Sequence, residues 1–169
     1  MNQLKSMFLR SLALLAFAGG LLFTQMSHAQ VLLASYPLMA GQHEAAGFVV
    51  VSGDETNIYV RYTTSEGWSL KETHLAVEAD FASIPQTGSG NVKIGRFEFG
   101  ESLNGATTAL YTIPRSGIGS LNFFVASHAV VERTSGSRET AWAGPLEFSG
   151  KNWATYFFVN GGSEEPPNR

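Results

Sequence analysis

Short runs rich in Val, Ile, Tyr, Phe and Trp recur between residues 49 and 159, and clusters of Gly, Pro, Asn and Ser separate them. Runs of this kind favour β-strands, and the clusters favour turns. No stretch in this region shows the 3.6-residue apolar period of an amphipathic helix. The sequence therefore predicts strands at 49–51, 58–62, 68–77, 106–113, 121–131 and 153–159.

The fold class follows from how these runs are spaced and patterned. Residues 49–51 and 58–62 lie on either side of a turn-rich segment and are expected to pair as a hairpin. The run Leu121–Ala126 is apolar in both alternating phases, which is typical of a strand covered on both faces. We expect an all-β fold, specifically an antiparallel β-sandwich that is jelly-roll-like. The longest irregular stretch, Ile84 to about Phe97, is long enough to be functional.

The amino-terminal 29 residues have the pattern of a secretory signal peptide. Lys5 and Arg10 lie before an apolar stretch over 11–23. Ser27-His28-Ala29 then supplies the small-x-small cleavage pattern. The apolar run is shorter than the roughly 20 residues that span a bilayer. With no cysteine in the chain there is no site for a lipid anchor. We predict an exported protein, periplasmic or extracellular, with no membrane anchor after cleavage.

The expected organisation is a signal peptide (1–29), a single β-sandwich domain (30–160) and a disordered tail (161–169) that lacks core-forming residues. The segment 1–29 carries two basic and no acidic residues, so the rest retains nine of the 11 Lys and Arg against 14 Asp and Glu, a formal charge of −5. That charge disfavours a nucleic-acid partner. The lack of cysteine excludes disulfides and thiolate chemistry.

The sequence lacks the short motifs that identify common catalytic and ligand-binding sites. It contains no G-x-S-x-G, no H-E-x-x-H, no phosphate-binding glycine loop and no calcium loop. No cofactor is therefore expected. After residue 29 the histidines are His43, His74 and His128. Strand alternation places Glu72 and His74 on one face and Thr73 on the other.

Two interpretations of the histidines remain open. In one, imidazole and carboxylate groups converge to hold a zinc-like ion or transfer a proton, using Glu72, His74, His128 and Glu139. In the other, which we favour, each histidine is a buried polar group satisfied by a neighbouring carboxylate or hydroxyl. Spacing alone does not bring strands so distant in sequence together.

The tryptophans pose a similar choice. An aromatic face can stack on a sugar ring while its edge stays hydrated. Trp142 is the best candidate for exposure, because Glu139–Pro145 is expected to be a loop between two strands. Packing of Trp142 over the end of the sandwich is the favoured alternative, and most other aromatic residues are expected in the core.

Several segments occur in a fixed order over residues 47–159: Gly67–Leu75, Ile84–Asn91, Glu139–Ala143 and Asn152–Phe157. Together they resemble the GWxLxETHL, IPQTxSGN and ETAWA...NWATYF motifs of a family of small exported microbial β domains of unassigned function. The chain departs from that pattern at Lys93–Gly95, which replaces a proline-containing turn, and after Trp142, where Ala143–Pro145 is shorter. The resemblance implies that Glu72, His74, Glu139 and Trp142 form one constellation.

We therefore expect a non-catalytic binding or surface-interaction module that recognises a glycan or another cell-envelope component, an analogy from fold to function. Its predicted ligand-binding residues are Glu72, His74, His128, Glu139 and Trp142. One alternative is a metal-dependent or acid/base hydrolase that uses His74 and His128. The other is a structural surface subunit whose edge strands pair with neighbours.

Overall fold

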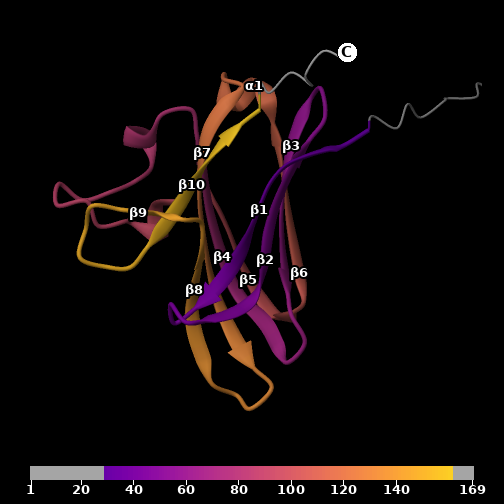
Figure 1. The fold of residues 1–169 in the computed structure, drawn as a ribbon, viewed down its shortest axis with the longest axis vertical. Helices are drawn as coiled ribbons and strands as arrows, with labels where there is room; N and C mark the ends of the chain where they lie inside the picture. Colours follow the sequence, from indigo (N-terminus) through magenta and orange to yellow (C-terminus); the bar gives the residue numbers. More distant parts are fainter. Residues whose placement is uncertain (1–28, 162–169) are drawn as a thin grey trace, which may run out of the picture.

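The computed structural model describes residues 29–161, which form ten strands and three short helical turns (Figure 1). The strands are β1 (Val31–Ala40), β2 (Glu44–Gly53), β3 (Asn57–Thr64), β4 (Trp68–Glu78), β5 (Phe99–Ala106), β6 (Thr108–Pro114), β7 (Asn122–Arg133), β8 (Arg138–Ala143), β9 (Leu146–Glu147) and β10 (Thr155–Asn160). The helical turns are η1 (Phe81–Ser83), η2 (Ile94–Arg96) and α1 (Arg115–Ile118). The predicted signal peptide and nearly all of the predicted tail lie outside the described residues.

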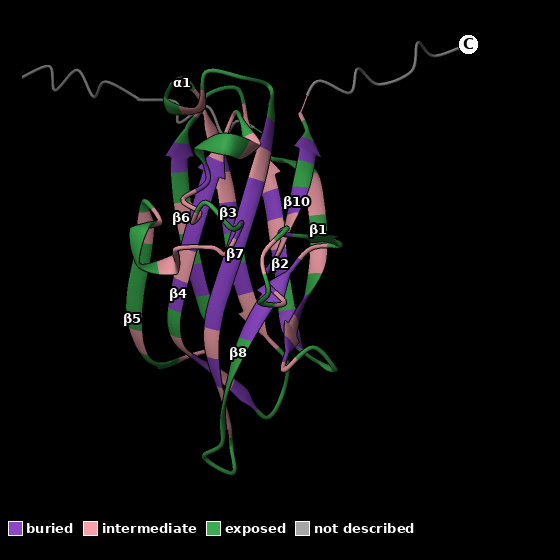
Figure 2. Ribbon diagram, turned by 90° about the vertical axis from the view of Figure 1, so that its left-hand side faces the viewer, coloured by how far each residue is buried: buried purple, intermediate pink, exposed green. Residues whose placement is uncertain are grey.

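The strands confirm the prediction of an all-β, antiparallel domain. The hydrogen-bonded strands follow the order β5-β4-β7-β8-β1-β2-β3-β6. β10 pairs with the amino-terminal end of β7, residues 122–125, beyond the part of β7 that pairs with β8. The sheet curls into a nearly closed barrel whose two edges, β5 and β6, are consecutive in the chain. In Figures 1 and 2, β1, β2, β3 and β6 face β4, β5, β7 and β8 across the interior.

The predicted hairpin is β2–β3, and its turn is closed by one carboxylate. Asp54 accepts hydrogen bonds from the backbone N–H groups of Thr56 (2.8 Å) and Asn57 (2.7 Å) and from the Tyr59 hydroxyl (2.7 Å). The Tyr59 hydrogen bond, followed by the backbone ones, holds the pKa of the Asp54 carboxyl well below its usual value. The turn-rich sequence therefore forms an Asx-type turn as expected.

Four strands were not predicted: β1, β5, β8 and the two-residue β9. The segment Glu139–Pro145, expected to be a loop, instead supplies most of β8, which pairs with β7 along one edge and with β1 along the other. Its residues Glu139, Ala141 and Ala143 have low strand preference. Pairing on both edges outweighs that local preference, because strand formation depends strongly on context.

The main core lies inside the sheet and is built from alternate residues of each strand, among them Leu38, Val49, Val60, Leu75 and Phe157. On β7, Phe123 and Val125 belong to this inner core, whereas Ala126 belongs to a second apolar cluster on the outer face. Figure 2 shows β7 buried over most of its length. The prediction that both faces of this strand are covered is confirmed.

Two irregular segments, residues 79–98 and 144–154, cover the outer face of β7 and β8, and we call them the cover (Figure 1). The first includes the stretch that the sequence predicted to be irregular. Phe81 links the two segments, since its ring centroid lies 5.5 Å from that of Phe148 and 4.6 Å from that of Tyr156. Within residues 29–161, no helix has the length and apolar character to cross a membrane.

Candidate functional site

A single row of side chains crosses the outer face of the sheet beneath and beside the cover. The register pairs Gly100 of β5 with His74 of β4, His74 with His128 of β7, His128 with Trp142 of β8, and Trp142 with Met39 of β1. Residues paired in this way point to the same face of a sheet. The ring centroids of His74 and His128 are 5.6 Å apart, and those of His128 and Trp142 are 4.9 Å apart. We call these residues the histidine row.

A β-bulge in β4 brings His74 to this face. Leu70 pairs with Val131 of β7 and Glu72 pairs with the adjacent Val130, so Lys71 is an extra residue in β4. The bulge changes the phase of the strand: Leu70 and Leu75 both face the core, while Glu72 and His74 face outward. The predicted shared face of Glu72 and His74 is thus correct, but its orientation depends on the bulge.

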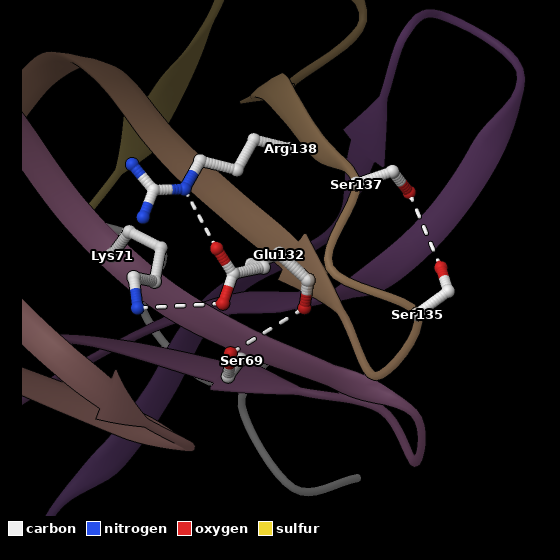
Figure 3. Close-up of polar contacts among 6 residues, drawn as sticks. All are labelled: Ser69, Lys71, Glu132, Ser135, Ser137 and Arg138. Carbon is white, nitrogen blue, oxygen red and sulfur yellow. Dashed lines mark hydrogen bonds and ion pairs between the residues drawn. The ribbon is translucent and has the colours of Figure 1, made fainter.

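An ion network holds the bulge in place (Figure 3). The Glu132 carboxylate of β7 lies 3.4 Å from Nζ of Lys71 and 2.6 Å from Nε of Arg138 on β8. The hydrogen bond from Arg138 is the main cause of the lowered pKa of Glu132, and Lys71 adds to it. The network therefore spans β4, β7 and β8, which are three of the strands that carry the histidine row.

His128 is buried, with 4% of its surface exposed, and neither of its ring nitrogens is hydrogen-bonded to a described residue. Burial, and secondarily the nearby His74, lowers the pKa of His128 from 6.5 to about 4, so the ring is neutral at pH 7. The sequence predicted a buried histidine satisfied by a neighbour. His128 is buried as expected, but its neighbours His74 and Trp142 present ring faces, not a hydrogen-bonding carboxylate or hydroxyl.

His74 and Glu72 lie at the open margin of the row. Nε2 of His74 is 3.6 Å from Oε2 of Glu72, and the two side chains are 27% and 52% exposed. The His74 ring leans over Gly100, where an added Cβ would stand 3.1 Å from Nδ1. A solvent-accessible pair of this kind contributes little to stability.

Glu139 is separated from the other predicted site residues. Strand alternation places it in phase with Ala141 and Ala143, which face the inner core, and opposite to Trp142. It lines a different pocket, of about 220 Å³, together with His43, Trp68 and Arg133. The expectation that Glu139 joins the constellation is therefore wrong, because the expected loop is a strand with strict alternation.

The same separation divides the four-residue set considered for metal binding or proton transfer, since Glu139 lies apart from Glu72, His74 and His128. Across residues 29–161, no three or more His, Asp or Glu side chains are grouped so that they could hold a metal ion. The structure brings together Glu72, His74, His128 and Trp142, but His128 is sealed from solvent.

A groove of about 190 Å³ opens where the row ends at Trp142, and we call it the tryptophan groove. Its lining residues come from β1, the β1–β2 turn, β8, the cover and β10: Met39, Gln42, Trp142, Gly144, Glu147, Trp153 and Thr155. Trp142 is only 4% exposed, so it is packed, as the favoured alternative held, and is not the exposed candidate. The strand pairings of β8 and the edge-on ring of Phe97, 6.4 Å away, bury it. The half-buried Trp153 supplies a second indole.

Two motif segments meet at the cover and place Trp153. Oδ1 of Asn91 accepts a hydrogen bond of 2.8 Å from the backbone N–H of Lys151, two residues before Trp153. At Gly150 an added Cβ would lie 2.7 Å from the Asn91 nitrogen, a distance that real Cβ atoms do not tolerate. The IPQTGSGN and NWATYF segments therefore act as one unit. Their joint presence in the sequence is the signal that could have indicated Trp153.

Gln42 reaches the groove through a strained turn. Gly41 and Gln42 both have left-handed backbone conformations, with φ of 54° and 72°, and the His43 N–H donates to the Ala40 carbonyl at 3.2 Å. The three residues between the paired Ala40 and Glu44 therefore form a tight hairpin turn. A non-glycine residue in this region costs of order 1 kcal/mol, which fits a position set by function.

A larger groove, of about 610 Å³, lies elsewhere, around Arg115 and Leu121 and between Ala29 and Gly161 at the ends of the described chain. None of the predicted site residues lines it.

The sequence matches no family model, and neither a curated protein nor a solved structure matches it. The grounds for a function are therefore the tryptophan groove and the histidine row.

Proposed function

We propose that this chain is an exported, non-catalytic binding module that recognises a glycan of the cell envelope through the tryptophan groove. The observation that carries the proposal is the convergence of Trp142 and Trp153 with the polar side chains of Gln42, Glu147 and Thr155. A sugar ring presents apolar C–H faces and hydroxyl groups, and such a groove offers both kinds of contact.

The size of the groove narrows the ligand. Its volume of about 190 Å³ is below the range of roughly 300 Å³ and above that is typical of pockets for drug-sized molecules. The groove thus suits one sugar residue at the end or side of a glycan.

Two further features support the proposal. The charge pattern of residues 1–29 favours export to the periplasm or the extracellular space, where envelope glycans occur. The facing halves of the sheet also favour a sandwich-like description, with β5-β4-β7-β8 packed on β1-β2-β3-β6. Sandwiches with aromatic grooves are common carriers of glycan-binding sites, an analogy from fold to function.

The test is binding of the intact protein to a glycan array, repeated with Trp153→Ala. Loss of the indole is expected to weaken binding at least tenfold, about 1.4 kcal/mol. Phe48→Ala is the matched control, because Phe48 is 49% exposed on β2, outside the groove. Binding that survives Trp153→Ala, or is lost equally in Phe48→Ala, would contradict the proposal.

A further inference from the structure

The charge of the tryptophan groove is one-sided. Among the described residues that line it, Glu147 is the only charged one. Its side chain is exposed, and its carboxylate makes no hydrogen bond or ion pair within the described part of the chain. No Lys or Arg of residues 29–161 lines the groove. A ligand there meets an unneutralised carboxylate next to two indoles.

Two indoles, a thioether and a carboxylate together form an environment for a cation. The π face of an indole attracts ammonium groups, with a strength of about 0.5–2 kcal/mol that increases with desolvation. A carboxylate adds a charge-assisted hydrogen bond. The chain contains a cation–π contact elsewhere, at the first residue of β4, where the Arg133 guanidinium carbon lies 4.4 Å from the ring centroid of Trp68.

The layer behind the groove does not oppose a cation. Trp142 rests against His128, which is neutral at pH 7 because burial lowers its pKa to about 4. A protonated imidazole 4.9 Å from the Trp142 ring would repel a bound ammonium group, and the buried setting prevents this near neutral pH.

From these observations we propose that the tryptophan groove takes an amino sugar residue with a free, protonated amine. The ammonium group lies toward Glu147, and the ring packs against Trp153. This inference rests on the proposed glycan-binding function and names its ligand class. The hydroxyl groups of a neutral sugar donate hydrogen bonds to the Glu147 carboxylate but do not balance its charge, so the structure favours the charged sugar over its acetylated form.

The test is isothermal titration calorimetry of the full chain with three trisaccharides of similar size: a glucosamine trimer, an N-acetylglucosamine trimer and a glucose trimer. A pH of about 6 keeps the amine protonated, since free amines of this kind titrate roughly between 7 and 8. The glucosamine trimer is expected to bind at least tenfold more tightly than either neutral trimer.

Glu147→Gln is expected to reduce the affinity for the glucosamine trimer at least tenfold and to leave that for the glucose trimer within about twofold. Glu66→Gln, an exposed acid in the β3–β4 turn, is the matched control and should change neither. Near-ultraviolet circular dichroism verifies that each variant is folded.

The outcomes separate the two proposals. Equal binding of charged and neutral trimers, with loss in Trp153→Ala, would overturn the amino-sugar inference and leave glycan binding in place. Binding of choline with none of the glucosamine trimer would also overturn it, because the ammonium would then be recognised without a sugar ring. If the wild-type protein binds no trimer and no arrayed glycan, both proposals fail.

Discussion

His128 places an imidazole in an apolar setting between His74 and Trp142, with both nitrogens unsatisfied by described residues. Leaving a buried polar group unpaired costs about 1–3 kcal/mol, a penalty that an apolar ring of similar shape avoids. His128 behind Trp142 therefore lowers the free energy of unfolding relative to an apolar ring, and a protonated ring lowers it further.

His128→Phe is expected to raise the free energy of unfolding at pH 7 by about 1 kcal/mol. It should also remove a pH dependence. The folded-state pKa of about 4 lies below the ordinary 6.5, so the unfolded chain takes up the proton first. Proton uptake by the unfolded chain therefore leaves the stability almost unchanged above about pH 6.5 and lowers it progressively as pH falls toward 4.

Between pH 7 and pH 5 the wild-type protein should therefore lose about 2 kcal/mol more than His128→Phe. Urea unfolding of both proteins at the two pH values measures this difference. If the bulkier phenylalanine offsets the gain at pH 7, the difference in slope still tests the prediction. Parallel pH profiles would show that His128 is not buried neutral.

At the scale of the element, the bulge in β4 decides which side chains reach the site. Lys71 is the extra residue, so Leu70 remains in the core while Glu72 and His74 face outward. The ion network of Glu132 with Lys71 and Arg138 crosses β4, β7 and β8 next to it. The sequence pattern around Lys71 does not show a bulge, because the change of phase requires a partner strand.

Deletion of Lys71 is expected to be tolerated. The strand would then alternate regularly, with Leu70 still inside and His74 still outside. Loss of the Lys71–Glu132 ion pair should cost about 1 kcal/mol at most, and the regular ladder should offset part of that cost. Deletion of Thr73 is the contrasting control: it moves either Glu72 or His74 into the core and should cost several kcal/mol. Chemical denaturation distinguishes the two, and equal losses would refute this account of the bulge.

At the scale of the whole molecule, an inner core closes the barrel and a separate outer cluster holds the cover against β7 and β8. The tryptophan groove forms where the cover meets β8 and the β1–β2 turn. The two segments of the cover touch closely at Gly90, Asn91 and Gly150. The cover has little regular secondary structure, however, and few backbone hydrogen bonds of a sheet hold it. We therefore expect it to open more readily than the barrel.

Gly150→Ala tests that expectation. The new methyl group would meet the Asn91 backbone and should destabilise the cover by about 1–3 kcal/mol. Gly88→Ala makes the same chemical change in the same cover, but its Cβ would meet nothing within 4 Å. Hydrogen exchange should accelerate in residues 79–98 and 144–154 of Gly150→Ala only, with the barrel strands unchanged. Uniform acceleration would mean that the cover and the barrel unfold together.

Local sequence patterns determined several features of this protein. The β2–β3 hairpin, the two covered faces of β7, the irregular stretch beginning at Ile84, and the shared face of Glu72 and His74 follow from propensity and alternation. Each depends on interactions between residues close in the chain, or on the burial of one strand. Patterns over a few residues report such interactions directly.

Tertiary structure alone decided the site. β8 became a strand through pairing on both edges, which buried Trp142 and placed Glu139 on the opposite face. The pairing of His74 with His128 depends on a register that the β4 bulge sets. The tryptophan groove joins segments distant in the chain. Long-range register and packing are properties of the closed sheet, so no short stretch of sequence encodes them.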